Sequence, residues 1–319
     1  MKPIFTVALV VILMVPLPWL VQSEFLINFA IMLLFSASLG QAWNVLGGYG
    51  GQFSFGHAAF FGTGAYAAAV LQTMFAINPW VGFVLAGLAG AGIGLVVGFL
   101  SFRFGLRGAY FALVTLAFAE ILRILANTAE FTGAGVGILI PLDRGAANLQ
   151  FADKTGFYLL ALALVALGLF ITAHLENSRF GARLMAVREN EDAAQASGVN
   201  VFEIKLKAIA LSGSLAGLAG AFYTQYFLYL DPIIAFGPTV SIEAILVPII
   251  GGTGTLFGPL LGSIALHAIS EITQHVAADA PGLNLIVYGV LLVLMVLFLP
   301  SGLSGLLARL RRRKTDLGE

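Results

Sequence analysis

The sequence contains no cysteine and has little charge for its length. The missing cysteine excludes disulfides, thiolate metal sites, iron–sulfur clusters and cysteine nucleophiles. Only 10% of the 319 residues are charged and 59% are hydrophobic, whereas a soluble domain has about 25% charged residues. The formal net charge is zero, so no basic excess indicates nucleic-acid binding. This composition excludes an ordinary soluble globular protein.

The sequence also lacks the short motifs of nucleotide- and metal-dependent enzymes. It contains no Gly-x-x-x-x-Gly-Lys-Ser/Thr phosphate loop, and the stretch GYGGQF at 48–53 does not complete Gly-x-Gly-x-x-Gly. The four histidines are scattered, and none lies in a His-Glu-x-x-His motif. No Ser/His or paired-carboxylate arrangement typical of an intramembrane enzyme can be assembled. We therefore expect a chain that is not an enzyme and binds no metal or cofactor of its own.

Long uncharged runs predict an all-α, polytopic membrane protein built as a single domain over residues 1–319. No Asp, Glu, Lys or Arg occurs between Glu24 and Arg103, which is room for three crossings at about 20 residues each. The pattern predicts about eight to ten spans, and the candidates lie near 4–21, 25–46, 53–75, 80–101, 108–127, 156–174, 207–229, 239–254, 257–277 and 283–299. Glycine breaks the third and eighth, so each either spans the membrane or is re-entrant.

Positively charged residues predict the orientation of these spans. With the N-terminus inside, thirteen Lys and Arg residues fall in inner segments and only Arg144 and Lys154 in outer loops. This distribution predicts cytoplasmic termini, a cytoplasmic loop at 176–207 and a basic cytoplasmic tail at 301–319. The first apolar run ends at Trp19 without an Ala-x-Ala cleavage signal, so we expect a retained helix.

Small residues recur at helical spacing within several predicted spans. Such faces let two helix backbones approach closely in a bilayer, where apolar side chains gain little by leaving lipid. They are Gly90, Gly94 and Gly98, then Gly213 and Gly217, then Gly258 and Gly262. The pattern predicts tight helix packing and does not select a function.

Ionisable residues within spans are functional candidates. Glu120 and Arg123 are three residues apart on one predicted helix, so they are expected to form an ion pair that is either structural or part of a pathway. Glu243 has no obvious partner nearby in sequence. We hypothesise that Glu243 lines a translocation path with Gln52, Ser54 and His57, because these residues lie on the glycine-broken segments. The alternative for His57 is a hydrogen-bonded core position.

The polar stretch after the sixth predicted span mixes both charges around a helix-forming core. Gly198 ends that core and a new helix follows into the membrane. The stretch is either a solvated helical hairpin or a surface that docks a soluble partner. Its candidate contact residues are Arg183, Arg188, Glu189, Glu191, Asp192, Ala193, Ala194 and Gly198.

Asp192-Ala193-Ala194 followed by Gly198 is similar to the Glu-Ala-Ala-x-x-x-Gly coupling signature of ABC permeases. The longer segment RENEDAAQASGVNVFEIKLKAIALSGSLAGLAGAFY, together with GGYGGQFSFGHAAFFGTGAY and SIEAILVPIIGGTGTLFGPLLG, resembles the M-type permease subunit of high-affinity branched-chain amino acid ABC transporters. Asp192 replaces the glutamate of the signature, and Ser212 stands where proline is frequent.

The resemblance implies a subunit of the bacterial cytoplasmic membrane that imports leucine, isoleucine or valine. ATP and magnesium would bind two separate ATP-binding subunits, which agrees with the missing phosphate loop. The other implied partners are a second homologous permease, a periplasmic or lipid-anchored substrate-binding protein, and membrane lipid. Similar permeases import urea, amides or aromatic acids. A self-contained secondary transporter that uses Glu120, His57 or Glu243 as a proton site is the remaining alternative.

Overall fold

The computed structural model describes residues 3–21 and 23–276, together with 286, 289, 290, 293 and 302–305. Nearly all of this part of the chain is helical. The α-helices are α1 (Pro3–Met14), α2 (Leu17–Leu20), α3 (Glu24–Trp43), α4 (His57–Phe75), α5 (Pro79–Arg103), α6 (Gly108–Thr128), α7 (Lys154–Asn177), α8 (Arg179–Glu189), α9 (Glu191–Ala196), α10 (Val201–Phe227), α11 (Pro232–Phe236), α12 (Pro238–Gly251) and α13 (Gly258–Val276).

Short elements complete the described fold. A π-helical turn, Asn44–Tyr49, extends α3, and short 3-10 turns cover Glu130–Thr132, Ala134–Val136 and Ala146–Asn148. The strands β1 (Ile138–Leu139) and β2 (Tyr229–Leu230) pair antiparallel, with Ile138 opposite Leu230. The chain is therefore an all-α protein in which one short antiparallel strand pair joins two segments that are distant in sequence.

Eight helical segments within the described residues are long and apolar enough to cross a membrane, which confirms the predicted polytopic class. They are Pro3–Leu20, Glu24–Tyr49, His57–Phe75, Pro79–Arg103, Gly108–Thr128, Lys154–Asn177, Val201–Phe227 and Pro232–Gly251. The predicted span at 257–277 corresponds to α13, which is not among them. The span at 283–299 and the basic tail at 301–319 lie almost entirely outside the described residues.

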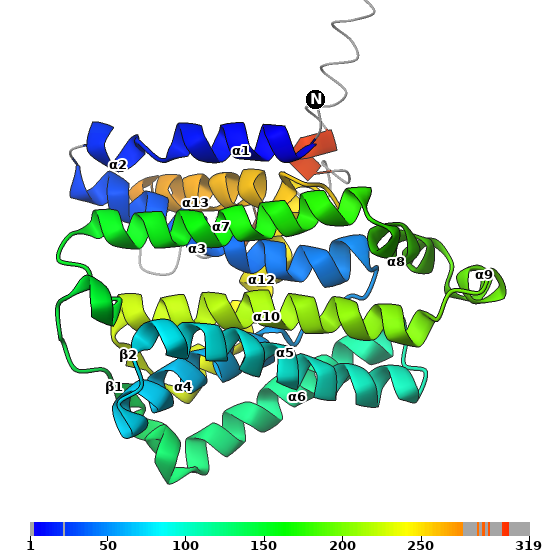
Figure 1. The fold of residues 1–319 in the computed structure, drawn as a ribbon, viewed down its shortest axis with the longest axis horizontal. Coiled ribbons are helices and arrows are strands. Elements are labelled where there is room, and N and C mark those ends of the chain that lie inside the picture. The colour runs from blue at the N-terminus through cyan, green and yellow to red at the C-terminus, as the bar shows by residue number, and fades with distance from the viewer. Residues whose placement is uncertain are drawn as a thin grey trace, which may run out of the picture.

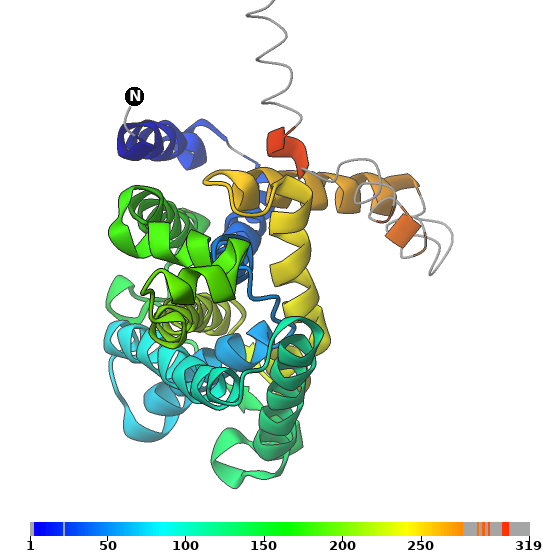
Figure 2. The same cartoon turned by 90° about the vertical axis from the view of Figure 1, so that its right-hand side faces the viewer.

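Helices α1, α3, α5, α7 and α10 run side by side, whereas α6 is tilted and α12 crosses them at a steep angle (Figure 1 and Figure 2). One end of this bundle carries α8 and α9, and the other carries β1 and β2. Viewed from the α8–α9 end, α10 lies inside the bundle while α1 lies at its edge beside α7 (Figure 2). The largest fully buried side chains include Trp43, Tyr158, Phe60, Phe111 and Phe222. The core is thus formed by aromatic side chains on several helices.

The two glycine-rich breaks fall at helix junctions and lie against each other. Residues 50–56 separate the π-helical turn from α4, and residues 252–257 separate α12 from α13. Asn44 joins them, because its Oδ1 accepts from the amide of Gly254 at 2.8 Å and its Nδ2 donates to the carbonyl of Thr255 at 3.1 Å. The side chain of Asn44 thereby satisfies backbone groups that no helix satisfies.

The predicted glycine faces form the contact between α5 and α10. A methyl group added to Gly90 would collide with the carbonyl oxygen of Gly213, and one added to Gly217 would lie 2.5 Å from the carbonyl oxygen of Ala86. The two backbones are therefore in direct contact, as Gly-x-x-x-Gly faces predict.

We expect Gly90→Ala to lower the thermal stability of the purified protein, because the new methyl group has no space against α10. Gly92 lies on the same helix, and a methyl group added there would meet open space. Gly92→Ala is therefore the matched control and should be neutral or stabilising by up to about 1 kcal/mol. Equal melting temperatures for the two variants in detergent would contradict the close α5–α10 contact.

Candidate functional site

The sequence fixes the ends of the helices at the α8–α9 end through side-chain caps. Ser178 Oγ accepts from the amide of Gly181 at 3.0 Å at the start of α8, and Asn190 Oδ1 accepts from Ala193 at 2.9 Å at the start of α9. Gly198, with φ of 85°, follows the end of α9. Ser and Asn satisfy free amides at helix starts, and Gly suits the left-handed position after a helix end. The predicted hairpin is therefore two short capped helices.

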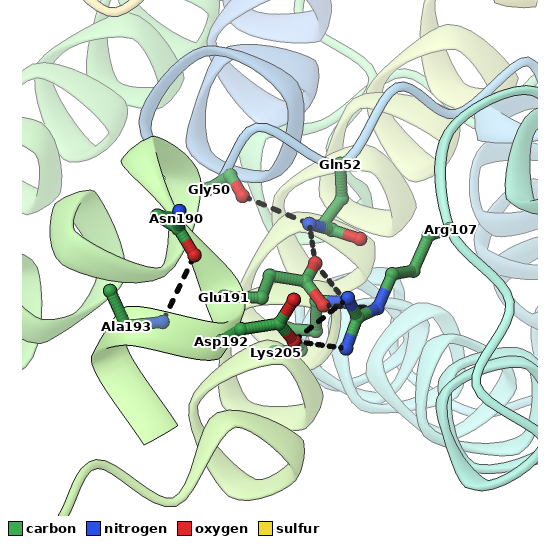
Figure 3. Close-up of polar contacts among 8 residues, drawn as sticks. All are labelled: Gly50, Gln52, Arg107, Asn190, Glu191, Asp192, Ala193 and Lys205. Atoms are coloured by element: carbon green, nitrogen blue, oxygen red, sulfur yellow. Dashed lines mark hydrogen bonds and ion pairs between the residues drawn. The ribbon is translucent and has the colours of Figure 1, made fainter. Parts of the chain in front are cut away.

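Glu191, the first residue of α9, is the centre of a polar cluster (Figure 3). Its Oε2 lies 2.9 Å from Nε of Arg107, in the α5–α6 loop. Its Oε1 forms an ion pair with Nζ of Lys205 on α10 and accepts from Nε2 of Gln52 at 3.1 Å. A single carboxylate therefore links α9 to the α5–α6 loop, to α10 and to the first glycine break.

The Lys205–Glu191 pair is largely withdrawn from water. The side chains of Lys205 and Glu191 are 4% and 14% exposed. The Lys205 ammonium also lies 5.0 Å from the centre of the Phe102 ring, within the range of a cation–π contact. Removing one partner of such a pair leaves a buried charge without compensation. The pair thus fixes where α9 meets the bundle.

Asp192 lies beside this pair at the surface. Both terminal nitrogens of the Arg107 guanidinium donate to Oδ1 of Asp192 at 3.1 Å, and the side chain of Asp192 is 78% exposed. A cavity of about 360 Å³ adjoins the cluster and is lined in part by Arg107, Glu191 and Lys205. The Asp192 contact is consequently open to water, unlike the Glu191 contact.

Through Arg188, helix α8 contacts the second glycine break and the π-helical turn that leads into the first. The Nη1 atom of Arg188 donates to the carbonyl of Gly48 at 2.7 Å. The same nitrogen would lie 2.6 Å from a methyl group added to Gly254, so the guanidinium passes directly over the second break. At the end of the π-helical turn that precedes the first break, Tyr49 Oη donates to Oε1 of Glu176 on α7 at 2.6 Å. A displacement of α8 would therefore act on both breaks together.

The remaining predicted docking residues form the outer surface of α8 and α9. Ala194 is buried and packs inward, whereas the other members of this set are exposed. They are Arg183, Glu189, Asp192, Ala193 and Gly198. The structure therefore separates the predicted set into an outward face and the inward contacts of Arg188, Glu191 and Ala194.

The structure does not bring the four predicted path residues together. Gln52 belongs to the Glu191 cluster. Ser54 lies in the first break, where its carbonyl accepts from Nε1 of Trp43 at 2.9 Å and its Oγ accepts from the amide of Gly56 at 3.2 Å. These contacts satisfy unwound backbone at the α8–α9 end.

His57 is fully buried at the start of α4. Its Nε2 lies 2.9 Å from Ser212 Oγ, and Ser212 Oγ lies 2.6 Å from the carbonyl of Ala42. Because a carbonyl only accepts, the Ser212 proton goes to Ala42, and Nε2 of His57 must be the donor to Ser212. This chain joins α4, α10 and α3, so the geometry matches the hydrogen-bonded core position.

Glu243 lies elsewhere, in a cavity of about 520 Å³ lined in part by Asn28, Tyr223, His267 and Glu271. Two residues earlier, Ser241 Oγ accepts from the amide of Ala58 at 2.9 Å. A separation of two residues rotates a helix by about 200°, so α12 presents Glu243 and Ser241 on opposite faces. Sequence spacing alone does not show which face of α12 points toward the first break. It therefore could not decide whether Glu243 lies with the other three path residues.

Glu120 and Arg123 form a bidentate ion pair on α6. Arg123 Nε lies 2.8 Å from Oε2 of Glu120, and Nη2 lies 2.6 Å from Oε1. The pair is not buried within this chain, because the two side chains are 51% and 30% exposed.

Sequence reasoning did not identify Arg107 and Lys205 as partners of Glu191, although both are basic residues next to predicted span ends. Basic residues at such positions are common near membrane surfaces, so the positions alone carry no pairing signal. The pairing depends on how the α5–α6 loop and α10 meet α9.

Lys205→Met should destabilise the protein by about 1–3 kcal/mol, because Glu191 loses one of its two counter-charges in a largely buried site and keeps only Arg107. The double variant Glu191→Gln with Lys205→Met should be more stable than the single variant. The matched control is Lys207→Met on the same helix, whose partner Glu203 is 52% exposed, and it should cost at most about 1 kcal/mol. Denaturant unfolding in detergent measures these differences, and equal losses at Lys205 and Lys207 would contradict the burial argument.

Comparison with known proteins agrees with the expectation from the sequence. Residues 23–296 match the family described as branched-chain amino acid transport system, permease component. The chain is 32% identical to the high-affinity branched-chain amino acid transport permease LivM of Salmonella typhimurium, over 95% of this chain and 75% of that protein.

More distant relatives extend the range of transported compounds. The chain is 28% identical to a probable LivM permease of Methanocaldococcus jannaschii, over 78% of this chain and 77% of that protein. It is 24% identical to the fructose import permease FruF of Bifidobacterium longum, over 77% of this chain and 70% of that protein. No solved structure matches the chain. The chain belongs to the family of permease components of branched-chain amino acid transport systems.

Proposed function

We propose that this chain is the M-type permease subunit of an ABC importer that carries leucine, isoleucine and valine across the bacterial cytoplasmic membrane. The substrate is supported by the LivM relatives, which are named as branched-chain amino acid permeases. The more distant fructose permease indicates that one architecture serves different solutes. Urea, amides and aromatic acids are therefore the substrates against which the proposal is tested.

The observation that carries the proposal is the contact of α9 with three elements of the membrane bundle through Glu191. An ABC permease must convert closure of its ATP-binding subunits into movement of its spans. The outward face of α8 and α9 is a convex helical surface that fits a partner's groove. Any displacement of α9 is then transmitted by Glu191 to Arg107, Lys205 and Gln52.

The orientation in this proposal places the α8–α9 end in the cytoplasm. Arg103 ends α5, Arg107 lies in the α5–α6 loop and Arg188 lies on α8, so all three are at that end, together with Lys205 and Lys207 near the start of α10. Helix α1 also begins toward that end (Figure 1). Arg144 and Lys154 lie toward the β1–β2 end. This asymmetry supports a cytoplasmic N-terminus and α8–α9 hairpin. The C-terminus is assigned to the same side from the sequence pattern alone.

The proposed partners match the two ends of the bundle. Two ATP-binding subunits, which hold ATP and magnesium, would bind this chain and a second homologous permease at the α8–α9 end. A periplasmic or lipid-anchored substrate-binding protein would contact the β1–β2 end. The loop there exposes large apolar side chains, including Val136 at 82% and Leu139 at 73%. Exposed apolar groups of this kind are frequent at protein interfaces.

Gly198 provides a test of the coupling surface. Its φ of 85° strains any β-branched residue, whereas asparagine accepts this conformation more readily. We expect Gly198→Val to reduce leucine uptake and substrate-stimulated ATPase activity several-fold in the assembled importer, while Gly198→Asn retains most of both. Equal activity of the valine variant and the wild-type importer would show that this turn does not couple the subunits.

Purification of the native complex tests the function itself. We expect two P-loop ATP-binding subunits to co-purify with this chain, and the reconstituted importer to accumulate radiolabelled leucine in an ATP-dependent manner. Urea, acetamide and phenylalanine serve as competing solutes. A permease that transports alone along a proton gradient, or an importer that prefers one of the competitors, would refute the corresponding part of the proposal.

A further inference from the structure

The Glu120–Arg123 pair lies at membrane depth on the outside of this chain. Helix α6 begins at Gly108 and ends at Thr128, and a rise of about 1.5 Å per residue places Glu120 roughly 18 Å from one end and 12 Å from the other. The hydrocarbon core of a bilayer is about 30 Å thick. Both charges are therefore within the hydrocarbon region if α6 crosses the membrane.

Lipid is an unsuitable neighbour for these two side chains. One charged side chain at mid-membrane costs about 2.5–3.5 kcal/mol on insertion scales, and such residues face water-filled cavities or other protein. Glu120 is half-exposed in this chain. The face of α6 that carries the pair is therefore a wall of an aqueous space or of a polar contact.

A cavity of about 430 Å³ is built from two parts of the chain and is lined by Glu120. Arg123 is not among the lining residues, but it is hydrogen-bonded to Glu120 three residues further along α6. Glu120, Leu113 and Leu116 contribute from α6, and Phe236 and Pro238 contribute from the α11–α12 junction. Apart from the Glu120 carboxylate and the Ser241 hydroxyl, which accepts from the amide of Ala58, the lining is apolar. The start of α12 has no side-chain cap, so its free amide groups add positive potential to the wall opposite α6.

This combination fits a small molecule that carries two opposite charges on adjacent groups and an aliphatic side chain. A lipid chain does not require the ion pair, and a sugar requires more hydrogen-bonding groups than these apolar walls offer. An aliphatic amino-acid zwitterion satisfies both features. Its ammonium group can pair with the Glu120 carboxylate and its carboxylate with the Arg123 guanidinium. Its aliphatic side chain can pack against Leu113 and Leu116.

We propose that the α6 face around Glu120 and Arg123 is a transit site for aliphatic amino-acid zwitterions on the aqueous translocation path. The ion pair opens, Glu120 receives the ammonium group and Arg123 receives the carboxylate. Each charge keeps an opposite partner before and after the exchange, so no charge is left uncompensated. The inference rests on the proposed import function and adds the site where this chain contacts the solute.

Cysteine labelling tests whether the site is aqueous, and the chain has no native cysteine to interfere. Ala117 lines the cavity, and Leu88 on α5 is the control, with similar depth and 62% exposure. In the reconstituted importer, Ala117→Cys should react with a charged methanethiosulfonate reagent, and Leu88→Cys should not. The reaction at Ala117 should slow when leucine-loaded binding protein and ATP are present. Failure of Ala117→Cys to react would overturn the proposal.

Charge variants test whether the pair recognises the solute. Glu120→Gln and Arg123→Gln should each lower leucine uptake by about tenfold or more per assembled complex, as expected for one lost charge-assisted hydrogen bond. The swapped variant Glu120→Arg with Arg123→Glu keeps an ion pair. It would exchange the positions of the ammonium and carboxylate groups of the solute and turn its side chain away from the apolar lining, so uptake should remain low. Full recovery in the swapped variant would mean that the pair only holds α6 in place.

The two proposals fail in different ways. If the wild-type importer does not accumulate any aliphatic amino acid, the proposed function is wrong. If it accumulates leucine and the single charge variants match it, only the transit site is wrong.

Discussion

The ion pair between Glu191 and Lys205 is the contact on which the α8–α9 hairpin depends. Helix α9 has only 6 residues, which is too short for a stable helix in water without tertiary contacts. Its position is set by Ala194, which packs inward, and by the buried carboxylate of Glu191. Lys205 is 3% exposed and the Glu191 side chain is 14% exposed, so both charges of the pair lose most of their hydration. It specifies one position of α9, since any other position would leave the Lys205 charge unpaired.

A second constraint comes from the bilayer, which does not satisfy free backbone groups. Both glycine breaks meet it by lying at the α8–α9 end and by taking hydrogen bonds from side chains. Asn44 bonds to the second break, Trp43 donates to the carbonyl of Ser54 in the first, and Arg188 donates to the carbonyl of Gly48 in the π-helical turn just before it. The glycines permit unusual backbone angles there, such as φ of 120° at Gly252. As a result, the breaks connect the helices of the bundle to α8.

Local patterns predicted much of this fold, and long-range pairing accounts for what they missed. Hydropathy predicted the eight spans that the structure shows as long apolar helices. The spacing of Gly90, Gly213 and Gly217 predicted close helix packing but not that α5 and α10 are the partners. Spacing of three residues was enough to pair Glu120 with Arg123. Gln52 and Glu191 are 139 positions apart, so no periodicity within one helix links them. Sequence reasoning grouped Gln52 with Glu243 because both lie on glycine-broken segments, whereas the packing of α12 places Glu243 in a separate cavity.

Helix α6 provides a mechanical route between the two sites. Arg107, which holds Glu191 and Asp192, immediately precedes Gly108 at the start of α6. Gly105 and Gly108 have φ of 69° and 55° with open space around them, so the loop can change its backbone angles with few contacts to break. A helix transmits displacement along its axis, and the Glu120–Arg123 pair lies on the same helix. In the proposed mechanism, movement of α9 pulls Arg107 and tilts α6 about this glycine hinge, and the tilt displaces the Glu120–Arg123 pair because the pair lies on the same rigid helix.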